Sequence, residues 1–184
     1  MTLANQLTVL RMCLVPVLVI LVIYGYFGWA LAVFAIAGIT DALDGLFARV
    51  RQERTQLGTI LDPLADKLLV VSSLIVLSIP NPLLTVRIPA WITILTISRD
   101  AGILLTVISV NLAVGRRIFP PTLLGKATTM VQLVTILWIF WCNYRGTTSA
   151  VTDSLLMLMV VFTIASALHY IYHARKLMAG WEAD

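Results

Sequence analysis

The sequence predicts an all-α integral membrane protein, built as a bundle of six transmembrane helices with both termini in the cytoplasm. Composition is the first reason. Of 184 residues, 60% are hydrophobic and 12% are charged, and the mean hydropathy is +0.96. A soluble domain of this length would expose far too much apolar surface, whereas a membrane bundle buries it in lipid. We interpret residues 1–184 as a single membrane domain that begins with a short interfacial segment, 1–7.

The second reason is that apolar runs recur six times, each near the length of about 20 residues that crosses a bilayer. Glycines, prolines or charges separate the runs, and such residues are typical of turns and loops. The separators in chain order are Gly25 to Gly28, Arg49 to Gln56, Pro80 to Pro89, Gly115 to Pro121 and Asn143 to Gly146. The predicted spans are 8–27, 29–49, 59–79, 89–110, 122–142 and 152–174.

Basic residues indicate the orientation, because cytoplasmic connections carry an excess of lysine and arginine. Six spans put both termini and the second and fourth connections on one side. The opposite side holds Arg87 and Arg145. The first side holds Arg11, Arg49, Arg51, Arg54, Arg116, Arg117, Arg175 and Lys176. We therefore expect that side to face the cytoplasm.

Four aspartates fall in the second and third spans, where an ionised side chain is costly unless a cation meets it. Asp41 and Asp44 are three residues apart, whereas Gly58, Asp62 and Asp66 are four apart, so each set shares one helix face. One short connection joins the two spans and brings the carboxylates to the cytoplasmic side. Oxygen-only ligands favour hard cations, so we expect Mg²⁺ or Mn²⁺ here.

The spacing of these residues forms a longer pattern, D-x2-D-G-x2-A-R-x8-G-x3-D-x3-D, from Asp41 to Asp66. This pattern resembles the signature of the CDP-alcohol phosphatidyltransferases. That family moves a phosphatidyl group from CDP-diacylglycerol to an alcohol and releases CMP. The resemblance implies a six-span, dimeric enzyme of the cell (inner) membrane whose partners are lipids rather than nucleic acid, with its active site facing the cytoplasm.

The resemblance also assigns roles to residues. It implies that Asp41, Asp44, Asp62 and Asp66 hold two divalent ions, Mg²⁺ or Mn²⁺, and that Asp66 also takes the proton of the acceptor hydroxyl. The residues implied to bind CDP-diacylglycerol are Asn5, Gly45, Arg49, Thr55 and Gly58. For Asn5, capping of the first helix is an equal alternative.

Three further polar residues, Arg99, Asp100 and Lys126, are predicted at a similar depth in the membrane. Charges inside a membrane favour a functional role, in which Arg99 binds the acceptor's phosphate, Asp100 orients it and Lys126 faces the same phosphate. Arg99 and Asp100 could instead form a structural ion pair. The segments L-D-P-L-A-D-K and G-K-x-T-T-x-x-Q resemble the phosphatidylglycerophosphate synthase branch, whose acceptor is glycerol-3-phosphate. The Arg99-Asp100 pair resembles CMP-forming cardiolipin synthases, which use phosphatidylglycerol, so both acceptors stay open.

Two other classes of membrane protein also place carboxylates in helices. Intramembrane prenyltransferases bind pyrophosphate through aspartate motifs, but those motifs lie far apart in the chain. A non-enzymatic cation transporter could use the aspartates as an ion site. That alternative gives no reason for Arg49 to stand at a fixed distance from Asp44.

Overall fold

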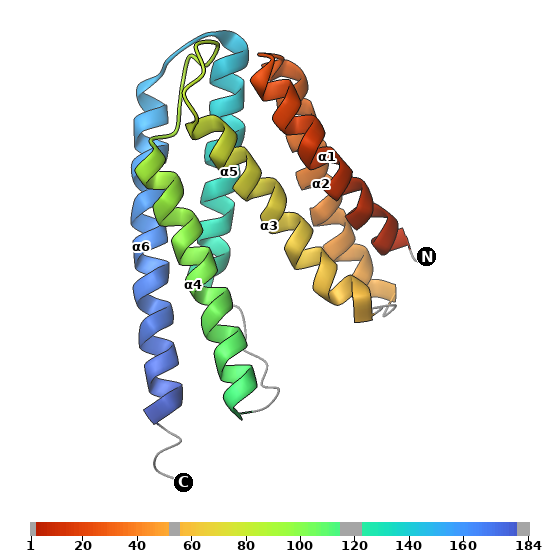
Figure 1. Ribbon diagram of the computed structural model, residues 1–184, viewed down its shortest axis with the longest axis vertical. Coiled ribbons are helices and arrows are strands. Elements are labelled where there is room, and N and C mark those ends of the chain that lie inside the picture. The colour runs from red at the N-terminus through yellow and green to blue at the C-terminus, as the bar shows by residue number, and fades with distance from the viewer. Residues whose placement is uncertain (1–2, 52–55, 115–122, 180–184) are drawn as a thin grey trace. The chain divides into compact units, whose positions relative to one another are not determined.

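The computed structural model describes residues 3–51, 56–114 and 123–179, with side chains for 10–40, 67–106 and 123–172. Every regular element in those ranges is an α-helix, so the all-α prediction is confirmed (Figure 1). The helices are α1 (Leu3–Ile23), α2 (Phe27–Arg51), α3 (Gln56–Ser78), α4 (Ala90–Val114), α5 (Leu123–Arg145) and α6 (Ala150–Ala179). Each contains most of one predicted span.

Two helices in the described ranges are long and apolar enough to cross a bilayer. They are α5 and the Ala150–Tyr172 part of α6, with mean hydropathies of 1.6 and 2.0. Among the residues whose side chains are described, α1, α2 and α3 contribute shorter apolar stretches, Leu10–Ile23, Phe27–Thr40 and Lys67–Ser78. The six-span arrangement and the orientation of the termini therefore stay predictions.

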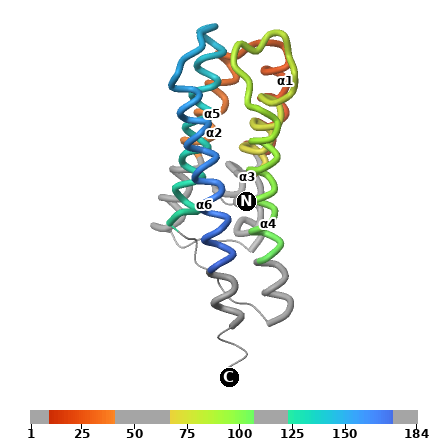
Figure 2. Tube along the Cα trace, turned by 90° about the vertical axis from the view of Figure 1, so that its left-hand side faces the viewer, coloured from red at the N-terminus to blue at the C-terminus, as the bar shows by residue number. Residues whose placement is uncertain are grey.

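The helices group into two compact units. Unit 1 comprises residues 1–88 and 136–149, and unit 2 comprises residues 89–135 and 150–184. In unit 1, α1 packs against both α2 and α3, as Figure 1 shows. In unit 2, α4 and α6 run side by side in Figures 1 and 2. The helix α5 contributes its N-terminal half to unit 2 and its C-terminal half to unit 1.

The buried face of α2 combines two small residues with one aromatic residue. Ala30, Phe34 and Ala37 are almost fully buried and follow one another at helical spacing. Phe34 meets Phe140 of α5 at a ring-centroid distance of 5.6 Å. The two alanines let neighbouring helices approach closely, which is how helices associate in lipid.

The turn predicted at Gly25 lies between α1 and α2. Gly25 has a φ of 79°, a conformation that only glycine adopts without strain. A Cβ atom there would also lie 3.0 Å from Leu83 Cδ1. The backbone angle therefore favours glycine at this position.

Asn143, near the end of α5, fixes the connection between α3 and α4. Its Oδ1 accepts hydrogen bonds from the backbone N–H groups of Thr85 and Val86, at 2.8 and 3.0 Å. Its Nδ2 donates to the carbonyl oxygens of Val86 and Ile139, at 3.0 and 2.9 Å. One buried side chain thus satisfies backbone groups of a non-helical segment, which would otherwise be unpaired in an apolar interior.

We expect Asn143→Ala to lower the free energy of unfolding by about 3 kcal/mol, because it strands two backbone N–H groups. The melting temperature in detergent should fall by about 10 °C. Ser154→Ala is the matched control, since it removes an exposed hydroxyl that is bonded only within its own helix at 3.2 Å. Equal melting temperatures for the two variants would contradict the role assigned to Asn143.

The interior of unit 2 contains many buried hydroxyl groups, and most of them donate hydrogen bonds to backbone carbonyls of the helices. Thr96 donates to Ile92 O at 2.8 Å, and Thr163 donates to Met159 O at 2.7 Å. Thr128 Oγ1 lies 3.2 Å from Phe162 O, which places that turn of α5 beside α6. The buried polar residues of this unit are Thr93, Thr96, Arg99, Asp100, Thr128, Gln132, Thr135, Thr152, Thr163 and Ser166.

Candidate functional site

The four predicted metal-binding aspartates lie on two successive helices, Asp41 and Asp44 in α2 and Asp62 and Asp66 in α3. The connection between these helices spans residues 52–55. By helical rise, Asp41 and Asp66 each lie about 15 Å from the helix end that meets this connection, and Asp44 and Asp62 each lie about 10 Å from it. Measured along each helix, the two pairs therefore lie at similar distances from the connection, and all four residues belong to unit 1.

The side chains of these aspartates lie outside the part of the chain whose side chains the structure describes. Within that part, no three His, Cys, Asp or Glu residues cluster as a metal site would require. The metal site predicted at the aspartates thus stays a prediction, supported by the position of its residues along α2 and α3.

The residues predicted to bind CDP-diacylglycerol lie on α1, α2 and α3 and on the connection between α2 and α3. Asn5 lies in α1, Gly45 and Arg49 lie in the last turns of α2, and Gly58 lies in the first turn of α3. Their side chains, like Thr55 as a whole, fall outside the described residues. Since α1 packs on both α2 and α3, the helix that carries Asn5 belongs to the same unit as the aspartates.

Arg99 and Asp100 form a buried ion pair in α4. Arg99 Nη1 donates to Asp100 Oδ1 at 2.6 Å, and both side chains are 5% exposed. Arg99 Nη2 donates to Ser166 Oγ of α6. A buried charge needs such compensation, so the ion-pair alternative accounts for how Arg99 is held in an apolar unit. Binding of an acceptor phosphate by this arginine stays a prediction.

Lys126 is exposed in the first turns of α5. The contact of Thr128 with Phe162 O puts this part of α5 beside α6 one turn before Ser166, the partner of Arg99. Lys126 and Arg99 thus lie within about one helical turn of each other in depth. Their depth relative to the aspartates stays a prediction.

Gln132 is a polar residue that the sequence analysis noted only as part of a motif. Its side chain is fully buried on α5. Neither its Oε1 nor its Nε2 has a hydrogen-bond partner among the residues whose side chains are described. A buried, unpaired amide is destabilising, in contrast to threonine, which can bond to the helix that carries it.

We expect Gln132→Met to raise the free energy of unfolding by about 1 kcal/mol, because the apolar side chain has a similar volume and leaves no unpaired group. Thr128→Val is the matched control one turn earlier, where the lost hydroxyl is 2.7 Å from Leu124 O. That control should be less stable than the wild type. Thermal unfolding in detergent measures both, and a lower melting temperature for Gln132→Met would show that the amide has a partner.

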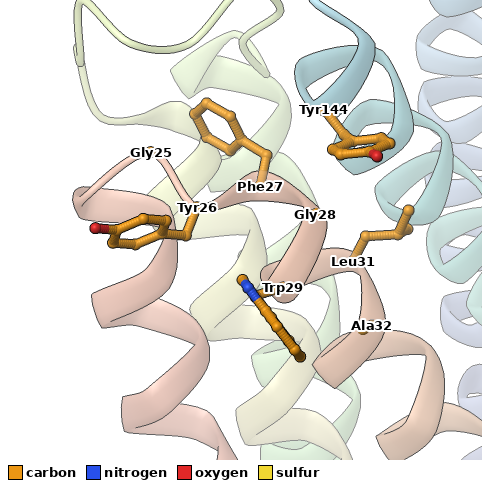
Figure 3. Close-up of a pocket in the computed structure, with 8 residues that line it drawn as sticks. All are labelled: Gly25, Tyr26, Phe27, Gly28, Trp29, Leu31, Ala32 and Tyr144. Atoms are coloured by element: carbon orange, nitrogen blue, oxygen red, sulfur yellow. The ribbon is translucent and has the colours of Figure 1, made fainter.

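A pocket of about 530 Å³ lies at the α1–α2 turn of unit 1 (Figure 3). Its lining contains no carboxylate and no basic side chain. A Cβ at Gly28 would lie 2.9 Å from the Tyr144 ring, so a larger residue there would displace this ring. The exposed Tyr26 and Trp29 suit a membrane interface. This pocket is at the end of α2 remote from Asp41 and Asp44, so we do not place chemistry in it.

Comparison with known proteins gives a consistent result. A family model described as CDP-alcohol phosphatidyltransferase matches residues 1–169. The chain is 35% identical to a probable phosphatidylglycerophosphate synthase of Mycobacterium tuberculosis, over 97% of this chain and 84% of the relative. It is 33% identical to the human cardiolipin synthase (CMP-forming), over 94% of this chain and 61% of the relative. A cardiolipin synthase (CMP-forming) of Streptomyces coelicolor is 35% identical over 70% of this chain and 60% of the relative.

Proposed function

The chain belongs to the CDP-alcohol phosphatidyltransferase family and is a phosphatidyltransferase; from that premise we propose that it transfers a phosphatidyl group from CDP-diacylglycerol to glycerol-3-phosphate, giving phosphatidylglycerophosphate and CMP. The observation that carries the proposal is the complete signature from Asp41 to Asp66, which extends over the successive helices α2 and α3. Membership of an enzyme family sets aside the cation-transporter alternative.

The signature residues fit divalent cations by the chemistry of their donors. Asp41, Asp44, Asp62 and Asp66 offer only carboxylate oxygens, the ligands that Mg²⁺ and Mn²⁺ prefer. These four side chains would hold two such ions. When bound, the ions would neutralise charge on the donor's pyrophosphate and on the departing CMP.

The chain's own groups perform the remaining work in this proposal. The acceptor's hydroxyl oxygen attacks the phosphorus of the phosphatidyl group, and the bond from that phosphorus to the oxygen of CMP breaks. Asp66 accepts the hydroxyl proton, which makes the oxygen a better nucleophile. Arg49 binds a donor phosphate through its planar guanidinium, and Gly45 leaves space for the nucleotide. Asn5, Thr55 and Gly58 complete the donor site.

The acceptor's phosphate is assigned to unit 2. Arg99 and Lys126 are cations at similar depth, and Asp100 holds the Arg99 guanidinium in one orientation. An anionic acceptor entering an apolar bundle requires such cations, because its charge would otherwise be uncompensated. We propose that these three residues distinguish phosphate-bearing acceptors from uncharged alcohols.

A second candidate is a CMP-forming cardiolipin synthase, with phosphatidylglycerol as the acceptor. It is favoured by the adjacent Arg99 and Asp100, which form the observed ion pair, and by similarity to relatives of that name. In both cases we place the enzyme in the cell (inner) membrane as a homodimer, with its active site on the arginine-rich, cytoplasmic side. That side also carries the α2–α3 connection.

The test is a CMP-release assay with purified protein, CDP-diacylglycerol and Mg²⁺. Separate reactions contain glycerol-3-phosphate, phosphatidylglycerol, inositol phosphate or serine. The first proposal expects CMP release with glycerol-3-phosphate and a product that carries a second phosphate. Release with phosphatidylglycerol alone would favour the second candidate, and release with none of the four would contradict both.

A further inference from the structure

The guanidinium of Arg99 has one nitrogen that its observed partners do not use. Nη1 is paired with Asp100 and Nη2 with Ser166. The Nε atom is buried and has no hydrogen-bond partner within the described part of the chain. An N–H of a guanidinium can only donate, so the unused position is a buried donor that a hydrogen-bond acceptor would satisfy.

A second buried polar atom of the same kind lies on α6. The hydroxyl oxygen of Tyr170 is buried and likewise has no partner among the described side chains. Tyr170 follows Ser166 by four residues, so the two share one face of the helix. Long side chains on a helix lean back over the preceding turn. The phenol of Tyr170 therefore extends toward the level of Ser166, where the guanidinium of Arg99 is held.

These two groups suit an oxygen that accepts hydrogen bonds. Guanidinium Nε–H and phenol O–H both donate, and a phosphate oxygen can accept both at once. Asp100 compensates the charge of Arg99 from the Nη1 side and leaves the Nε side for a guest. A ligand with donors alone, such as an ammonium group, would leave both atoms unsatisfied and would add a like charge.

We propose that Tyr170 is an acceptor-binding residue, which donates a hydrogen bond to the acceptor's phosphate beside Arg99. In this arrangement Ser166 is a positioning residue that fixes the guanidinium. The proposal rests on the proposed function, because it names a further residue of the same acceptor site. The phosphate ester can come from glycerol-3-phosphate or from phosphatidylglycerol, and the two have this group in common.

A purely structural role for Tyr170 makes a different prediction. Removing a buried hydroxyl that lacks a partner leaves stability unchanged or raises it, and it has no reason to change substrate binding. Loss of a hydrogen bond to a charged phosphate instead weakens the binding of that substrate alone. Kinetics and stability measured on one variant therefore separate the two roles.

The experiment compares Tyr170→Phe with Tyr172→Phe, a matched control on the same helix whose side chain is 67% exposed. CMP release is measured in Mg²⁺ with glycerol-3-phosphate and, separately, with phosphatidylglycerol. For Tyr170→Phe we expect the KM of the acceptor that the wild type uses to rise about 10-fold or more. The KM for CDP-diacylglycerol should equal that of the control within the error of measurement. The melting temperature should equal or exceed that of the control.

Three results would overturn the inference: an unchanged acceptor KM, equal changes in the KM of donor and acceptor, or a lower melting temperature than that of Tyr172→Phe. The last would show that the hydroxyl has a structural partner. Ser166→Ala gives a second measurement, with a smaller increase in acceptor KM expected. If the wild type releases CMP with neither of the two acceptors, the proposed function fails. If the wild type releases CMP with one of them and Tyr170→Phe has the same KM for that acceptor, only the role of Tyr170 fails.

Discussion

Asp66→Asn is expected to lower kcat for CMP release by about 1,000-fold or more, while the protein stays folded and assembles as the wild type does. The amide has nearly the same shape as the carboxylate but cannot accept the proton of the acceptor hydroxyl. It is also a weaker ligand for a divalent cation. Two proposed roles of Asp66 are lost together, which is why this single substitution should have so large an effect.

The matched control is Asp153→Asn, which makes the same chemical change at an exposed position in the first turn of α6. It should release CMP at the rate of the wild type. Size-exclusion chromatography and melting temperature test whether each variant is folded. Normal turnover by a folded Asp66→Asn protein would remove this residue from the proton-accepting role.

The helices could be predicted from the sequence because membrane insertion imposes a simple length rule on apolar runs. Glycine and proline then mark where a run ends, as Gly25 does between α1 and α2. The prediction of six apolar helices and of the family followed from this pattern and from the aspartate spacing. The all-α class and the family are confirmed.

Contacts between helices could not be predicted, because a single sequence does not give the register of one helix against another. Ser166 is an unremarkable serine in an apolar helix until α6 packs on α4 and brings it to Arg99. Asn143 was interpreted as part of a turn, yet it bonds to residues 57 and 58 positions earlier in the chain. Its role depends on how α5 packs beside the α3–α4 connection.

The two kinds of site residue therefore differ in how they can be found. The aspartates follow helical spacing within two adjacent helices, so local sequence is enough to propose them. Tyr170 has no such signal, and only its buried, unpaired hydroxyl distinguishes it. Unpaired polar atoms inside an apolar unit conflict with stability, and such conflicts are expected at functional sites.

Removal of divalent cations is expected to abolish CMP release, and added Mg²⁺ or Mn²⁺ should restore it. The carboxylates of α2 and α3 would otherwise repel one another and the donor's pyrophosphate.

Asp41→Asn should raise the Mg²⁺ concentration needed for half-maximal activity by about 10-fold or more, because one oxygen ligand loses its charge. Calorimetric titration of Mn²⁺ into the protein gives a second measurement that does not depend on activity. Asp153→Asn is again the control and should bind Mn²⁺ like the wild type. Full activity in excess chelator, or equal Mn²⁺ affinity in Asp41→Asn and the control, would contradict a metal site at these aspartates.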